Sequence, residues 1–186
     1  MPHQIHRWCR KSGALLLASM VAACRSTDAT APIPLVRDAS PLQTEALSYS
    51  LVRSPNAYTV TVTATYVNTT GARVYYQRCG IASTSPMFDL RLTGPDSTRT
   101  NVFGGFAWAC VGGVPTGVLA PGEQVTIRVP FGGPDQPRAQ PPITPENYTG
   151  RFRILLGLCA RHVADSDACE LIPDRARQSN AFEIRL

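Results

Sequence analysis

Lysine is nearly missing from this chain of 186 residues, in which Lys11 is the single example. Histidine is also scarce: His3 and His6 lie close to Lys11, so that His162 is the one histidine in the rest of the sequence. If the N-terminal segment is removed, the chemistry of phosphate-loop and Schiff-base lysines is excluded. We therefore expect a protein that is not an enzyme and that binds no cofactor.

Long hydrophobic runs are also absent. A bilayer-spanning helix needs about 20 apolar residues, whereas Ser12–Ala23 is shorter and follows a positively charged stretch without acidic residues. This arrangement is typical of a secretory signal peptide. The segment ends in Val21-Ala22-Ala23-Cys24, which resembles the lipobox of bacterial lipoproteins. We predict that residues 1–23 are a signal peptide and that Cys24 carries the lipid; an ordinary secretory signal is the alternative.

The lipobox resemblance also implies a location. In that family, an aspartate after the lipidated cysteine retains the protein at the inner membrane, and this chain has Arg25 instead. The resemblance therefore implies a lipoprotein of the cell envelope, anchored to the membrane through Cys24. In a Gram-negative source the outer membrane, on its periplasmic side, is favoured.

A basic excess is missing once the signal peptide is removed. The segment takes three of the 18 basic residues, so that 15 basic and 13 acidic residues remain. Nucleic-acid binding requires a clustered basic face, and we expect no nucleic-acid partner.

Helical periodicity is absent from the remaining sequence, and alternation with period two replaces it. Apolar and hydroxyl side chains alternate from Tyr58 to Tyr66, which predicts a strand with one buried face. A shorter alternation covers residues 47–51. Further strands are expected at Arg73–Arg78, Met87–Thr93, Asn101–Ala109, Gln124–Val129, Arg151–Leu158 and Ala181–Leu186.

These elements predict an all-β domain. About eight short strands separated by turns, with no helices between them, indicate a single antiparallel β-sandwich over residues 45–186. Residues 24–44 are rich in Ser, Thr, Ala and Pro and are predicted to be a flexible tether. The segment Pro130–Pro145 is too proline-rich for a strand and is expected to be a long loop inside the sandwich.

Several short motifs resemble the immunoglobulin-like domains of bacterial envelope lipoproteins. They are turns followed by strands, and their order is also similar to the sandwich of the bacterial intracellular proteinase inhibitors. The motifs are Tyr66–Gly71, Phe88–Leu92, Leu119–Glu123, Gly150–Ile154 and Ser179–Ile184. The resemblance implies an immunoglobulin-like fold over residues 45–186 and supplies no catalytic residue.

Four cysteines remain when Cys9 is removed with the signal and Cys24 carries lipid. In an oxidising compartment an even number indicates disulfides, and four cysteines allow three connectivities. We predict Cys79 with Cys110 and Cys159 with Cys169. No Cys-x-x-Cys pair occurs among them, which argues against a zinc site.

The loop between Cys159 and Cys169 gathers several reactive side chains. It holds His162, Asp165, Ser166 and Asp167, and Glu170 follows. A hydrolytic triad needs these groups on rigid supports at hydrogen-bonding distance, and a calcium site needs six or more oxygens. We favour a solvated hairpin tip over both, and predict no metal site.

Two other segments have two interpretations each. Phe103–Trp108 combines three aromatic residues with two glycines. A buried, bulged strand is favoured over an exposed recognition surface. The proline-rich segment is favoured as a surface loop over a polyproline ligand.

The sequence therefore predicts a monomeric, non-catalytic binding or structural module anchored at the cell envelope. Its partner would be an unknown envelope protein or a glycan. A protease inhibitor is the alternative, motivated by the family resemblance. An enzyme ranks third, because paired acidic residues in a recognisable setting are missing.

Overall fold

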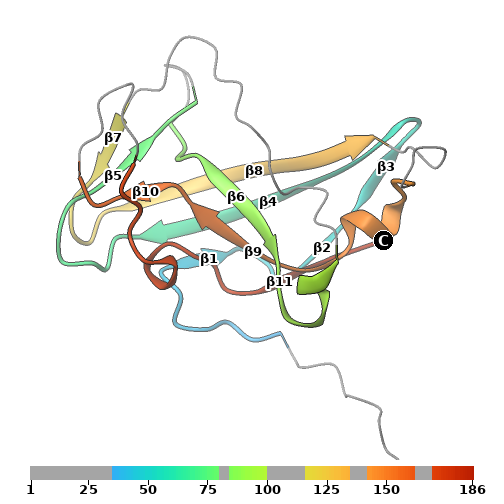
Figure 1. Ribbon diagram of the computed structural model, residues 1–186, viewed down its shortest axis with the longest axis horizontal. Coiled ribbons are helices and arrows are strands. Elements are labelled where there is room, and N and C mark those ends of the chain that lie inside the picture. Colours follow the sequence, from blue (N-terminus) through green and yellow to red (C-terminus); the bar gives the residue numbers. More distant parts are fainter. Residues whose placement is uncertain (1–34, 80–83, 100–115, 135–141, 162–168) are drawn as a thin grey trace, which may run out of the picture. The chain divides into compact units, whose positions relative to one another are not determined.

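The computed structural model describes residues 35–79, 84–99, 116–134, 142–161 and 169–186 (Figure 1). Pro34–Leu186 belong to one compact unit. Every regular element in the described ranges is a strand or a short 3-10 turn, which confirms the all-β prediction. These ranges contain eleven strands in three sheets, more than the eight or so expected.

The first sheet is built around β4 (Ala57–Val67). One side of β4 pairs along its whole length with β8 (Gln124–Pro134), and the other side pairs with β1 (Leu42–Thr44) and β3 (Val52–Ser54). The predicted alternation is confirmed: the apolar residues of β4 from Tyr58 to Tyr66 are at most 3% exposed, and the threonines between them are exposed or half-buried.

The second sheet has the order β2 (Ser48–Ser50), β11 (Phe182–Arg185), β9 (Gly150–Leu156) and β6 (Phe88–Leu92). Its pairs are antiparallel except β2 with β11, which is parallel. The fully antiparallel prediction is therefore wrong at this pair. In sequence, β2 lies near the start of the domain and β11 near its end. The long chain between them permits a parallel pair, whereas a tight hairpin joins antiparallel strands.

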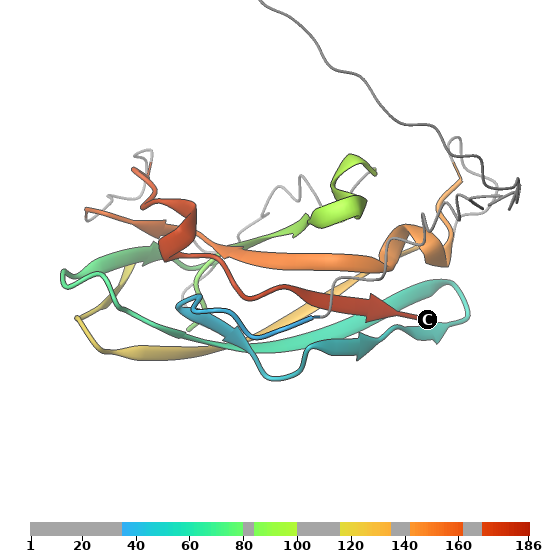
Figure 2. The same ribbon diagram turned by 90° about the horizontal axis from the view of Figure 1, so that it is seen from below.

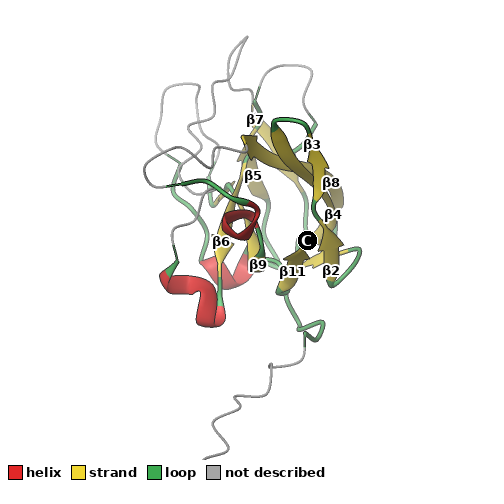
Figure 3. Cartoon of the chain, turned by 90° about the vertical axis from the view of Figure 1, so that its right-hand side faces the viewer, coloured by secondary structure: helices red, strands yellow, loops and turns green. Residues whose placement is uncertain are grey.

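The third sheet is small, with the order β10 (Leu158–Cys159), β5 (Val74–Gln77) and β7 (Thr116–Leu119). Three 3-10 turns lie between strands in the described ranges, and Figure 3 shows them in red: η1 (Gly94–Thr98), η2 (Pro145–Tyr148) and η3 (Asp174–Ala176). The expected strand at Asn101–Ala109 lies outside the described residues. In the turn after β7, Gly122 has a φ of 78°, the left-handed conformation that glycine adopts without strain.

One buried cluster joins the sheets. Apolar side chains of β4 and β8 face those of β6, β9 and β11 across it, so that the first and second sheets form two layers (Figure 2). Phe88 of β6 meets Phe131 of β8 edge to face, with ring centroids 5.5 Å apart. The third sheet adds Val74, Tyr76 and Leu119 to the same core.

The first sheet includes residues that the sequence assigned to the tether. Leu42 is fully buried, and Leu42–Thr44 pair with β4. Upstream, the carboxylate of Asp38 accepts a hydrogen bond from Arg153 Nη2 at 2.8 Å. Burial alone would raise the pKa of Asp38, but hydrogen bonds from Ser40 and Arg153 and the charge of Arg153 outweigh it and hold this pKa below its usual value. The ordered domain therefore starts before residue 45.

The backbone hydrogen bonds of β4 show which side of β8 is open. On the β1 side, Glu45 N donates to Thr63 O at 2.8 Å, and Val67 N donates to Pro41 O at 3.0 Å. Successive residues of an antiparallel strand direct their backbone groups alternately to the two neighbouring strands. Even-numbered residues of β4 therefore bond to β8, where odd-numbered residues such as Val129 oppose them. The backbone groups of the even-numbered residues of β8 point away from β4.

Pro130 and Pro134 occupy two of these outward positions, opposite Thr61 and Ala57. Proline lacks a backbone N–H, and a strand tolerates it where its nitrogen faces an open edge. The expected loop at Pro130–Pro145 is therefore wrong for its first five residues, which continue β8. Residues 135–141 lie outside the described ranges.

Candidate functional site

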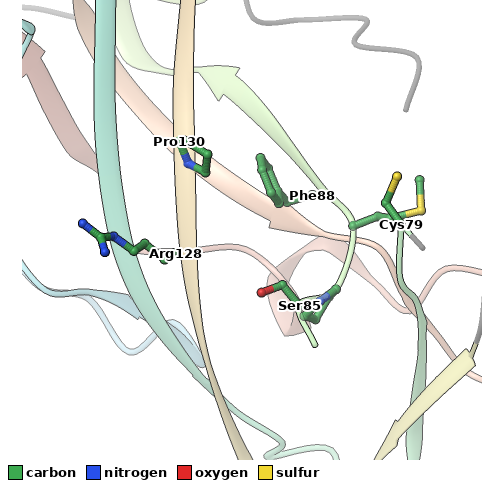
Figure 4. Close-up of a pocket in the computed structure, with 7 residues that line it drawn as sticks. Cys79, Ser85, Phe88, Arg128 and Pro130 are labelled. Carbon is green, nitrogen blue, oxygen red and sulfur yellow. The ribbon is translucent and has the colours of Figure 1, made fainter. Parts of the chain in front are cut away.

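A pocket of about 250 Å³ lies beside the open edge of β8 (Figure 4). Three stretches of chain form it: the start of the segment after β5, the residues just before and at the start of β6, and the middle of β8. The lining residues are Cys79, Ser85, Pro86, Met87, Phe88, Arg128 and Pro130. The floor is mainly apolar, which suits an apolar side chain.

Backbone hydrogen bonds fix the wall that carries Met87. Its N–H donates to Gln77 O at 3.0 Å, and its carbonyl accepts from Gly157 N at 2.7 Å. Phe88 follows at the start of β6 and packs against Phe131. Cys79, beyond the end of β5, is disulfide-bonded. Hydrogen bonds to β5 and to Gly157 therefore hold this wall, and Phe88 ties it to the core.

The opposite wall is the edge strand β8. Within the described ranges, β4 is the one strand that pairs with β8. The outward N–H and C=O groups of Gln124, Thr126 and Arg128 therefore meet no ladder partner in this part of the chain. Pro130 interrupts the row of donors. The open edge is a six-residue stretch that ends where the pocket begins.

Arg128 is the charged group of the site. It is exposed on the outer face of the first sheet, opposite Thr63, and extends from β8 on the side away from Phe88 (Figure 4). Its guanidinium forms no ion pair and no hydrogen bond in the described structure. The neighbouring Thr126 shares a hydrogen bond of 3.0 Å with Thr65, hydroxyl to hydroxyl. The edge therefore presents a cation on a surface of threonines.

The described residues of the site supply three kinds of binding group. Backbone donors and acceptors, one guanidinium and an apolar pocket provide hydrogen bonds, charge attraction and burial, which are the elements of peptide recognition. No group of three or more metal-ligating side chains occurs in the described ranges. No helix in those ranges is long and apolar enough to cross a membrane.

The structure tests one of the two predicted disulfides directly. Cys159 and Cys169 are bonded, with Cα atoms 5.5 Å apart. Cys79 is disulfide-bonded as well. Its predicted partner Cys110 and the predicted lipidation site Cys24 both lie outside the described residues, so these two assignments stay predictions.

The other predicted candidates are mostly outside the described ranges. This holds for His162, Asp165, Ser166 and Asp167, and for the aromatic segment 103–108. Glu170 is described, and its carboxylate pairs with Arg161 at 3.4 Å, with both side chains largely exposed. Glu170 is therefore a solvent-exposed residue of the surface in the described structure.

Sequence reasoning did not single out Arg128 or residues 85–88 as parts of a site, although it predicted a strand from Met87. Arg128 looks like an ordinary outward residue of an alternating strand, and nothing local shows that its strand has an open edge. The two prolines two and six positions later were the available signal. Proline at positions of one parity in a strand indicates an edge.

Comparisons with known proteins add little. No protein-family model and no curated protein matches the chain. Among solved structures, β-glucosidase from Kluyveromyces marxianus in complex with glucose aligns with a TM-score of 0.21 and 10% sequence identity. The alignment covers 78% of this chain and 14% of the enzyme, so that this chain spans a small part of its length. A TM-score this low carries no argument about fold or function.

Proposed function

We propose that this chain is a lipid-anchored protein of the cell envelope whose domain is an immunoglobulin-like β-sandwich that works as a binding module, without catalysis. The observation that carries the binding role is the open edge of β8, in the described ranges, beside a mainly apolar pocket. An exposed strand edge promotes unwanted pairing and is usually blocked. Here only its second half carries prolines.

The immunoglobulin-like assignment has support from the layered core. Two sheets face each other over one cluster of buried side chains, as in a β-sandwich. The motif beginning at Tyr66 supplies the end of β4 and a tight turn, and the motif Phe88–Leu92 coincides with β6. In this proposal the domain is a monomer, and its partner is an envelope protein or a glycan.

The proposed anchor is the lipid on Cys24. The charged start, the short apolar run and the sequence Val21-Ala22-Ala23-Cys24 support it. Acyl chains add about 0.8 kcal/mol of membrane affinity per buried methylene, and more than one chain is needed for stable anchoring. The lipobox resemblance implies three acyl chains. With Arg25 after the cysteine, the proposed location in a Gram-negative source is the outer membrane, on its periplasmic side.

Membrane fractionation of Cys24→Ser tests the anchor. The wild-type protein should sediment with membranes, and the variant should appear in the soluble fraction. Cys9→Ser is the matched control, because it also removes an N-terminal thiol but lies inside the predicted signal peptide. It should behave as wild type. If the Cys24→Ser protein stays bound to membranes after a carbonate wash, the proposal is contradicted.

A further inference from the structure

We propose that Gln124–Val129 of β8 is the docking edge for an extended peptide segment of a partner protein. The segment adds a strand to the first sheet, and it carries an acidic residue with an apolar residue on each side. The inference deepens the proposed binding function by naming the class of partner. It does not depend on the lipid at Cys24.

The backbone supplies the first part of the argument. Glu45 N to Thr63 O fixes the odd-numbered groups of β4 on the β1 side, so that Gln124, Thr126 and Arg128 direct their N–H and C=O groups outward. An added strand hydrogen-bonds to such a row with main-chain groups alone. Pro130 has no N–H and ends the row of donors, which limits the added segment to about six residues.

The pocket supplies the second part. Side chains of an added strand alternate between the two faces of the sheet. The side chain opposite Arg128 lies on the outer face, the face that carries the Arg128 side chain, and its two neighbours point to the inner side. There the pocket between Phe88 and Pro130 adjoins the edge (Figure 4). Apolar residues on both sides of an acidic one therefore fit this edge.

Charge selects a partner over a second copy of this chain. In a regular antiparallel pair of two β8 edges, outward residues oppose outward residues, and these are even-numbered. Arg128 would then face Gln124, Thr126 or Arg128 of the other copy, none of which is acidic. An acidic residue of a partner's segment compensates the positive charge of Arg128, because opposite charges across a strand pair stabilise the pairing.

Fluorescence anisotropy with a labelled probe tests the proposal. The probe is the hexapeptide Thr-Val-Glu-Val-Thr-Val, blocked at both ends, added to the full-length lipoprotein in detergent micelles. We expect saturable binding that Thr126→Pro weakens at least tenfold, because the substitution removes an outward N–H. Thr126→Ala is the matched control: it loses the same hydroxyl contact with Thr65 and keeps the N–H, and it should bind as wild type.

The charge is tested separately. Arg128→Gln should weaken the glutamate probe about two- to fivefold at low salt, in keeping with a solvent-exposed ion pair. It should leave the corresponding glutamine probe unchanged. Equal effects of Arg128→Gln on both probes contradict the role of charge.

A second measurement avoids the protein variants, in case Thr126→Pro does not fold. Probes N-methylated at alternate residues, in the two possible sets, should differ, since only one set of amides faces β8. Methylation of that set should abolish binding, and methylation of the other set should leave most of it.

Three results would overturn the proposal: no binding of any probe, equal affinity of both methylated sets, or a wild-type dimer that Thr126→Pro abolishes. If the Thr126→Ala protein and the folded Thr126→Pro protein crosslink to the same partner equally well in native membranes, the binding function stands and this edge is excluded as its site.

Discussion

The turn after β4 depends on one buried amide, that of Asn68, which is 1% exposed. Its Nδ2 donates to Leu119 O at 3.0 Å and to Ala72 O at 2.7 Å. Its Oδ1 accepts from the backbone N–H and the hydroxyl of Thr70, at 3.1 and 2.8 Å. Asn68→Ala removes all four hydrogen bonds without changing any backbone atom type of the turn.

The expected loss of stability depends on whether water can replace the amide at each hydrogen-bond partner. The carbonyl of Leu119 lies in buried surroundings and loses a partner there, which costs about 1–3 kcal/mol. Ala72 and Thr70 are exposed, so water replaces those bonds and each loss costs about 0.5 kcal/mol. We expect Asn68→Ala to lower the free energy of unfolding by about 3 kcal/mol. For a domain of this size that corresponds to a fall in Tm of roughly 6–12 °C.

Urea unfolding followed by circular dichroism measures this change. Thr69→Ala is the control, because Thr69 lies in the same turn but is exposed, and its substitution should change the free energy of unfolding by less than about 0.5 kcal/mol. If Asn68→Ala is as stable as Thr69→Ala, the amide does not hold this turn, and the contribution assigned to its bonds is refuted.

Two further predictions concern the core. Gly117→Ala should lower the free energy of unfolding by about 1–3 kcal/mol in the same assay, because a Cβ would lie 2.3 Å from Tyr76 Cζ; Val118→Ala, on the same strand but half exposed, should be nearly neutral. Burial raises the pKa of Tyr66 to about 12. The unfolded chain therefore ionises Tyr66 from about pH 10, before the folded protein does, and stability should fall by about 2–3 kcal/mol as pH rises from 10 to 12. Tyr66→Phe should show a shallower decline in unfolding experiments over this range, and identical pH profiles would contradict the assignment.

Strands with a long alternation could be predicted from the sequence. Tyr58–Tyr66 alternates over nine residues and is the centre of β4, and Phe88, Leu90 and Leu92 belong to β6 as expected. In these segments burial on one face of the sheet decides both the pattern and the structure. The turn glycines were equally local signals, as Gly71 and Gly94 both have positive φ.

The short strands β5 (Val74–Gln77) and β11 (Phe182–Arg185) lie inside predicted ranges, but the pairing of β2 and β3 could not be predicted in this way. Residues 47–51 show one alternation, yet β2 pairs with β11 in the second sheet while β3, two residues later, pairs with β4 in the first. β3 pairs with its neighbour in sequence, whereas the partner of β2 is the last strand, far away along the chain. The start of the domain was hidden for a similar reason: Thr44 N donates to Asn180 Oδ1 at 2.7 Å, and both residues are buried. A polar segment was assigned to the tether because its hydrogen-bond partners are distant in sequence.

The candidate site was hidden by an interpretation of proline. Pro130 and Pro134 argued against a strand when they were counted, but their spacing is even, so that both nitrogens face the same side of any strand that contains them. That side cannot carry a complete ladder and must be an edge. The same parity places the N–H groups of Thr126 and Arg128 on this edge, before the first proline. Even proline spacing after an alternating segment thus predicts both an open edge and the residues that line it, and β8 has both features.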